Sequence, residues 1–105
     1  MAPLGEFEVL VLLAVMHLAD HAYPPAVRSE IERRAQRKVA RGAVYVTLDR
    51  LEAKRLLVSH LSNTAGVGRP RRAYRVSPKG LRAVRRALAA VESMRLGLEP
   101  LLDPS

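Results

Sequence analysis

An uninterrupted apolar run, "VLVLLAVM" (Val9–Met16), most constrains how this chain of 105 residues folds. Apolar residues recur at helical spacing on both sides of the run and predict a first helix over roughly residues 4–19. A helix that is apolar on every side has to be covered on every side. One small domain has little core to spare for this, so we expect a second subunit to supply part of the cover. The alternative is a helix at the centre of the core of a single domain.

The same run is too short to cross a membrane, which takes about 20 apolar residues. No basic residue precedes it, so it does not have the form of a signal peptide. The sequence contains no cysteine, which excludes disulfides, thiolate catalysis and zinc held by cysteine. We therefore expect a cytoplasmic protein with no membrane partner.

Two more helices follow the first. The prolines of "DHAYPP" interrupt the apolar pattern and suit the first turn of a second helix, over residues 25–36. After a short connection, the pattern predicts a third helix over residues 41–55. The residues expected to point inward from these two helices are Val27, Ile31, Ala35, Val44, Leu48 and Leu51.

The pattern then changes to that of two strands, over residues 56–62 and 72–77. The loop between them, "NTAGVGRP", favours an antiparallel hairpin because it contains Asn, Gly and Pro. Ser77 suits the N-cap and Pro78 the first turn of a last helix, which extends to about Arg95. The fold class is therefore mostly α with a small β-hairpin.

Positive charge is concentrated in the second half of the chain. Eighteen Lys and Arg residues face ten Asp and Glu, which gives a net charge of +8, and fifteen of the eighteen are Arg. Residues 1–27 contain no Lys or Arg, whereas residues 53–91 contain ten and no acid. The planar guanidinium group suits phosphates and guanine edges. This distribution predicts a polyanion on one face of the protein.

The second and third helices have the spacing of a helix-turn-helix, whose second helix enters the major groove of DNA. The hairpin would form a wing on the adjacent minor groove or backbone, and Gly66 and Gly68 would let the loop approach closely. On this interpretation the charge of the wing is uncompensated inside the protein because its partner is nucleic acid. A solvated helix face and a solubilising turn are the alternatives. The residues expected to bind DNA are Arg41, Gly42, Tyr45, Val46, Arg50 and Lys54 around the third helix, with Arg69, Arg71 and Arg72 in the wing.

Two stretches, "GAVYVTLDRLEAKRLLV" (Gly42–Val58) and "GRPRRAYRVSPKG" (Gly68–Gly80), resemble the signature of PadR-type winged helix-turn-helix transcriptional regulators. The sequence departs from the family pattern at Ser77, where Thr is usual, and at Leu56, where a Gly commonly ends the recognition helix. "AYPPAV" also replaces the usual Tyr-Gly-hydrophobic entry into the second helix. The residues that fall in register with the pattern are Tyr45, Leu48, Leu51, Glu52, Tyr74 and Gly80.

The resemblance implies a bacterial homodimeric repressor that binds double-stranded DNA through the third helix and the wing. It places a winged helix-turn-helix domain at residues 1–77 and a C-terminal dimerisation helix and tail at residues 78–105. The apolar stripe of the last helix and the leucines of the tail agree with this, although the tail could instead pack on its own domain. The identity of an effector stays open. The residues expected in the dimer interface are Phe7, Leu10, Val11, Leu81, Val84, Leu88, Val91, Met94 and Leu98.

Other functions have less support in the sequence. His17 and His21 have a spacing compatible with a metal site, but the first helix ends near Ala19, which favours surface or interface histidines. No Ser-His-Asp arrangement and no Gly-rich phosphate motif is present, so we expect neither an enzyme nor a cofactor. The main competing function is a winged-helix interaction module that binds an acidic protein or RNA.

Overall fold

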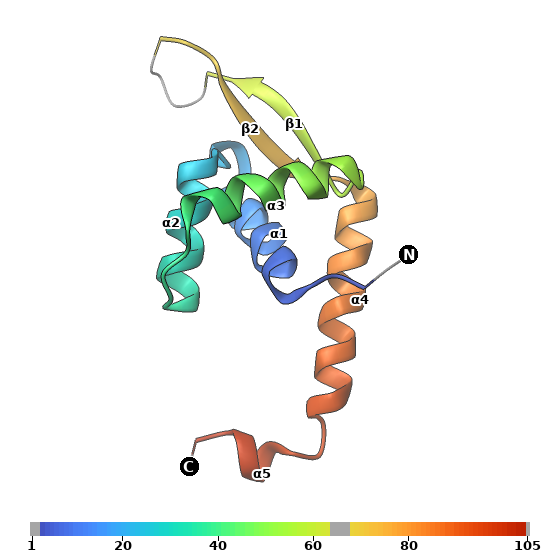
Figure 1. The fold of residues 1–105 in the computed structure, drawn as a ribbon. Helices are drawn as coiled ribbons and strands as arrows, with labels where there is room; N and C mark the ends of the chain where they lie inside the picture. The colour runs from blue at the N-terminus through green and yellow to red at the C-terminus, as the bar shows by residue number, and fades with distance from the viewer. Residues whose placement is uncertain (1–2, 64–67, 105) are drawn as a thin grey trace.

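The computed structural model describes residues 3–63 and 68–104, and its order of elements confirms the predicted fold class (Figure 1). The short helices η1 and α5 were not predicted from the sequence. Among the described residues, no helix combines the length and the apolar character needed to cross a membrane. The elements are α1 (Glu6–Leu18), η1 (Ala19–His21), α2 (Pro24–Ala35), α3 (Arg41–Ala53), β1 (Leu57–Ser62), β2 (Arg71–Val76), α4 (Pro78–Arg95) and α5 (Glu99–Leu102).

Helix α1 lies at the centre of the core of the single chain. It contacts α2, α3, β2 and α4, and its Val11, Leu12 and Val15 side chains are buried within the chain. The chain itself covers this side of α1, as the alternative of a central core helix requires. Met16 is 44% exposed and Leu10 is partly buried, so a second subunit as further cover stays a prediction.

Three predictions about individual side chains need correction. Val11 and Val84 belong to the core cluster of the chain, so they are not on a surface that a second subunit could contact. Periodicity could not separate them from the other residues expected in the dimer interface, because both sets follow the same apolar side of each helix. Ala35 is exposed rather than buried, because α2 ends there and Gln36 adopts a left-handed conformation as its C-cap.

The turn after α3 differs from the expectation at Leu56. In this turn the residue with a left-handed backbone is Arg55, with φ of +63°. It lies one position before Leu56, where the family pattern commonly has glycine. Leu56 is instead fully buried, and its amide donates to the Leu51 carbonyl oxygen at 2.9 Å. Helix α3 thus ends as a glycine would end it, but with arginine in the left-handed conformation that glycine adopts most readily.

The hairpin is antiparallel, as predicted, and its register runs from Leu57 opposite Val76 to Ser62 opposite Arg71. The Tyr74 amide donates to the Ala22 carbonyl oxygen at 3.1 Å, which ties β2 to the segment before α2. Gly66 lies outside the described residues. Gly68 has φ of +66°, a conformation that glycine adopts readily.

Helix α4 begins against the end of α3. The Ser77 hydroxyl caps α4 by accepting from the Gly80 amide at 3.0 Å, and it donates to the Arg55 carbonyl oxygen at 2.7 Å. The Ser77 amide donates to the Leu56 carbonyl oxygen at 3.1 Å. A Cβ atom on Gly80 would lie 2.1 Å from that same oxygen. Only glycine therefore allows this approach of α4 to the turn.

We expect Gly80→Ala to lower the free energy of unfolding by about 3 kcal/mol, because the new methyl group has to push the Leu56 carbonyl group away. Gly42→Ala is the matched control, since no atom lies within 4 Å of a Cβ atom added there. On the exposed first turn of α3 it should leave stability unchanged or raise it by up to about 1 kcal/mol. Urea unfolding of both variants checks this, and equal stabilities would refute the steric argument.

Candidate nucleic-acid interface

Helix α3 has one side in the core and one side in solvent. Val44, Leu48 and Leu51 are buried, as predicted, and fix the helix against α1 and α2. Tyr45 and Val46 project outward, and Val46 is 55% exposed although it is apolar. Such a residue contributes nothing to the core of the chain. It is suited to an apolar contact with a partner, for example the methyl group of thymine.

The turn between α2 and α3 is braced by polar contacts. The Arg28 side chain donates to the Val39 carbonyl oxygen at 2.8 Å, while Glu32 accepts from the Val39 amide at 2.9 Å. Val39 itself is buried. These contacts satisfy the backbone of the connection and set the position of the start of α3.

Two predicted DNA-binding residues lie together at the start of α3. The Arg41 guanidinium lies 5.5 Å from the centre of the Tyr45 ring. Both residues line a hollow of about 360 Å³ that also includes Pro24 and Arg28 from α2. The stacking holds Arg41 beside the outward side of α3 while its charge stays exposed. Gly42 and Arg50 are exposed on the same helix.

The three wing arginines have different environments. Arg69 is exposed near the end of the loop. The Arg71 guanidinium lies 4.5 Å from the centre of the ring of Tyr23, a buried residue next to the start of α2. Arg72 forms an ion pair with Glu52 of α3 at 2.6 Å. The prediction that the wing charge is uncompensated is therefore wrong for Arg72, and Glu52 holds the wing against α3.

Glu52 accepts from two elements at once. The Ser59 hydroxyl of β1 donates to one carboxylate oxygen and Arg72 of β2 donates to the other. The hydrogen bond from Ser59 has the largest effect on the pKa of Glu52 and lowers it. The charge of Arg72 lowers the pKa further, and together they outweigh burial, which raises it. Glu52 falls in register with the family pattern, but its partners were not predicted. The sequence signal for its importance is that Glu52 is the single acid between residues 50 and 91.

Lys54 is engaged with α1. Its ammonium group lies 2.9 Å from the carboxylate of Glu8, a buried residue that also accepts from the Gly5 amide at 2.9 Å. Burial raises the pKa of Glu8, but the Gly5 amide and Lys54 outweigh that effect and lower it overall. Lys54 therefore neutralises a buried acid. Its predicted contact with DNA is not part of the function proposed below.

The two histidines of the metal hypothesis, His17 and His21, are both exposed. Over residues 3–63 and 68–104, no group of three or more His, Cys, Asp or Glu side chains is placed to hold a metal ion.

We expect Glu52→Gln to lower stability at neutral pH by about 1 kcal/mol or less, because the site is partly exposed and solvent screens the ion pair. The pKa of Glu52 is lowered in the folded state, so its contribution is present above its unfolded pKa and is lost as the pH falls through the folded value. The difference between parent and variant should thus shrink from pH 6 to pH 3. Urea unfolding at several pH values measures it, and a difference that is constant over this range would contradict the assignment.

Solved structures of similar fold were found. A PadR family transcription regulator from Clostridium difficile is 21% identical, with 93% of this chain and 99% of that chain covered and a TM-score of 0.74. A PadR family transcriptional regulator from Eggerthella lenta is 28% identical, with 95% and 88% covered and a TM-score of 0.68. MepR of S. aureus, solved as a complex with DNA, is 15% identical, with 95% and 66% covered and a TM-score of 0.66. No curated protein matches the sequence of the chain.

The family comparison covers the helix-turn-helix, the wing and the start of α4. The model of the transcriptional regulator PadR-like family matches residues 12–86, which is more than half of the chain. The match includes the recognition helix, the Glu52 contacts to the wing and the close approach at Gly80 described above. This chain belongs to the PadR-like family of transcriptional regulators.

Proposed function

We propose that the chain acts as a homodimer that binds an inverted-repeat operator in double-stranded DNA and represses transcription. The observation that carries this proposal is the exposed side of α3, with Arg41, Tyr45, Val46 and Arg50, beside a hairpin that Glu52 holds in place. In Figure 1 the hairpin projects beyond α3. An α-helix fits the major groove, where the edges of all four base pairs differ.

Each part of this surface has a distinct role in the proposed complex. Arg50, Tyr45 and Val46 on α3 face the base edges, where arginine binds guanine through two hydrogen bonds. Arg69 and Arg71 in the wing face the adjacent minor groove or the backbone. MepR was solved as a complex with DNA, and that protein shares the fold of this chain. This likeness supports the choice of duplex DNA over an acidic protein or RNA.

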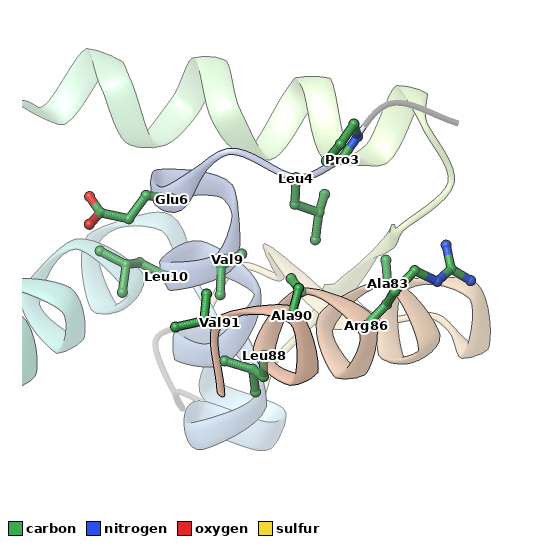
Figure 2. A pocket seen from close by; sticks show the side chains of 11 residues that line it. Pro3, Leu4, Glu6, Val9, Leu10, Ala83, Arg86, Leu88, Ala90 and Val91 are labelled. Atoms are coloured by element: carbon green, nitrogen blue, oxygen red, sulfur yellow. The ribbon is translucent and has the colours of Figure 1, made fainter. Parts of the chain in front are cut away.

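The dimer is proposed to form through the outer half of α4. The apolar side of α4 continues past the core, where Val91 is 68% and Met94 78% exposed. A groove of about 580 Å³ runs between α1 and α4, with Leu4, Val9 and Leu10 on one side and Ala87 and Val91 on the other (Figure 2). Exposed apolar surface of this extent is typical of a protein interface.

Val11 and Val84 are buried in the core and are therefore not part of the proposed interface. The other residues predicted for it lie at or near the surface. Leu81 is partly buried, and Phe7 packs against the core with the Arg37 guanidinium 5.8 Å from its ring. Two such subunits, related by a two-fold axis, would place their α3 helices about one helical turn of DNA apart. The interface residues in this revised proposal are Phe7, Leu10, Leu81, Leu88, Val91, Met94 and Leu98.

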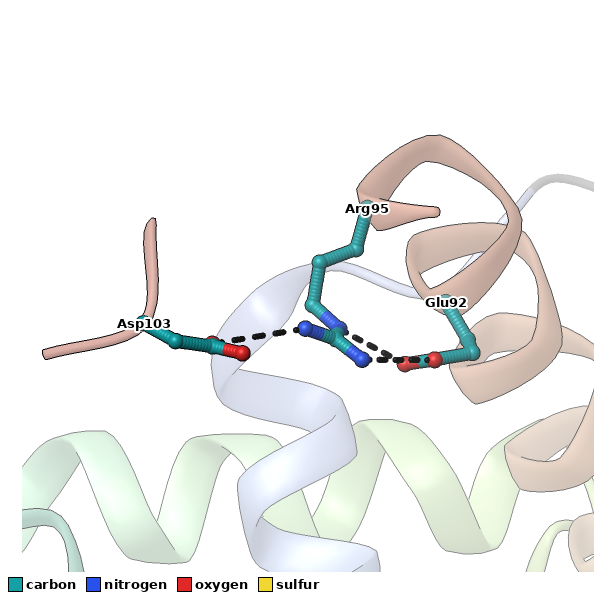
Figure 3. A network of polar contacts seen from close by, with 3 residues as sticks. All are labelled: Glu92, Arg95 and Asp103. Atoms are coloured by element: carbon teal, nitrogen blue, oxygen red, sulfur yellow. Dashed lines mark hydrogen bonds and ion pairs between the residues drawn. The ribbon is translucent and has the colours of Figure 1, made fainter. Parts of the chain in front are cut away.

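The C-terminal tail is held close to α4 by one arginine. Arg95 donates to both carboxylate oxygens of Glu92, at 3.1 and 3.0 Å, and lies 3.5 Å from the Asp103 carboxylate (Figure 3). This pairing positions α5, whose Leu101 and Leu102 are exposed. The tail therefore extends the apolar surface of α4 instead of covering the core of its own chain.

We expect Arg50→Ala to weaken binding to the preferred duplex by about 1–3 kcal/mol and to relax its base preference, because a bidentate base contact is lost. Arg69→Ala should weaken binding to all duplexes by a similar factor, because a backbone contact carries no sequence information. The measurement is a low-salt gel shift with a duplex selected from a random pool and with its single-base-pair variants.

The proposed function fails if the parent protein selects no duplex sequence and neither substitution changes binding to any duplex. Recovery of one acidic protein or of RNA in place of enriched DNA would support the interaction module instead.

We expect the double substitution Val91→Glu, Met94→Glu to convert the dimer into a monomer without loss of fold, because both side chains are exposed in the single chain. Ala89→Glu is the control, because Ala89 is exposed on the other side of the same helix. Light scattering after gel filtration gives the mass, and circular dichroism gives the helix content. A two-chain mass for the double variant would exclude this interface.

A further inference from the structure

The first half of α4 carries a cluster of arginines that neither the recognition helix nor the wing accounts for. Arg82, Arg85 and Arg86 are exposed, whereas Ala83 and Val84 between them are buried. At 100° per residue the three arginines lie together on the outer side of α4, away from its apolar stripe. We call these three residues the α4 ridge.

The charge of the α4 ridge is not compensated within the described part of the chain. The ion pairs there use other bases, and none involves Arg82, Arg85 or Arg86. No acid occurs in the sequence between Glu52 and Glu92. In contrast, the exposed arginines of α2, Arg33 and Arg34, both pair with Glu30.

This arrangement opposes the stability of α4. Like charges three and four residues apart repel on a helix surface. The N-terminal part of a helix favours acidic side chains, yet the first turn of α4 has none and the ridge follows directly. The ridge does not stabilise the helix that carries it. We therefore expect a negatively charged partner outside the chain.

The chemistry of the ridge favours a phosphate backbone. All three bases are arginines, which bind phosphate through two parallel hydrogen bonds. The exposed neighbours on the same side, Ala89 and Ser93, are small and offer no aromatic or large apolar anchor. Protein interfaces depend on such anchors, whereas contacts with a nucleic-acid backbone do not.

The ridge is also connected to the end of α3. Lys79 donates to the Lys54 carbonyl oxygen at 3.1 Å, which joins the first turn of α4 to the last turn of the recognition helix. Arg55 is exposed at that junction. A row of cations therefore continues from the end of α3 to the outer side of α4.

We propose that the α4 ridge binds the phosphate backbone of the duplex outside the base pairs that face α3. This inference rests on the proposed DNA binding and extends the DNA surface beyond the winged helix. The ridge would increase affinity and salt dependence without changing base preference, because backbone contacts carry no sequence information.

The test compares Arg82→Ala, Arg85→Ala with a control that removes the same charge, Arg33→Ala, Arg37→Ala, from residues that are ion-paired. Arg86 is left in place because it also lines the groove next to the proposed dimer surface. The probes are a 40-bp duplex with the selected operator at its centre and the same operator trimmed to its conserved base pairs. Affinity is measured at several salt concentrations.

On the long duplex, the ridge variant should bind about tenfold more weakly than the control variant. The slope of log K against log salt should fall by roughly two relative to the parent, one for each lost phosphate contact. On the trimmed operator the two variants should bind alike, with the same consensus sequence. Equal affinities of the two variants on the long duplex would overturn the proposal.

Failure of operator recognition can be distinguished from failure of the ridge proposal. If the parent selects no consensus, the same comparison is made with a 40-bp duplex of random sequence. A weaker affinity of the ridge variant there supports the ridge even though operator recognition has failed. Gel filtration of both variants confirms that the oligomeric state is the same.

Discussion

The carbonyl group of Leu56 is the contact on which the arrangement of the functional parts depends. It lies between the end of α3 and the start of β1, accepts from the Ser77 amide and faces Gly80 at the start of α4. The end of α3, the base of the wing and the start of α4 therefore meet at one backbone atom. Any side chain at residue 80 would separate them, because a Cβ atom there would lie 2.1 Å from the oxygen.

The positive charge of the wing has two roles. Arg72 is paired with Glu52 and holds β2 against α3, and Arg71 stacks on the ring of Tyr23 near the start of α2. Arg71 and Arg72 begin β2, at the end of the hairpin nearest the loop, and their contacts hold this part of the wing against the domain. Arg69 remains exposed near the loop. A charge-rich hairpin that has to be held against its domain and also attract phosphate needs both kinds of arginine.

The sequence pattern predicted most of the fold, because helix caps, turn residues and apolar spacing are local signals. The pairing of Ser77 with Gly80 and the start of α3 at Arg41 agree with it. Two ion pairs that join separate elements could not be predicted from local patterns, since Arg72 meets Glu52 across 20 residues and Lys54 meets Glu8 across 46. Val11 and Val84 were misassigned because core and interface share one apolar period.

Helix α4 separates the two proposed surfaces by its own geometry. Its inward side is the core near Val84 and becomes exposed apolar surface at Val91 and Met94, while its outer side carries the α4 ridge. A charged side chain inside an apolar interface is costly, so the two surfaces have to lie on different sides of the helix. Because α4 is one continuous helix, any tilt that repacks the apolar side also moves the ridge. In the proposed complex, dimer geometry and contact with the DNA backbone would then be coupled through one helix.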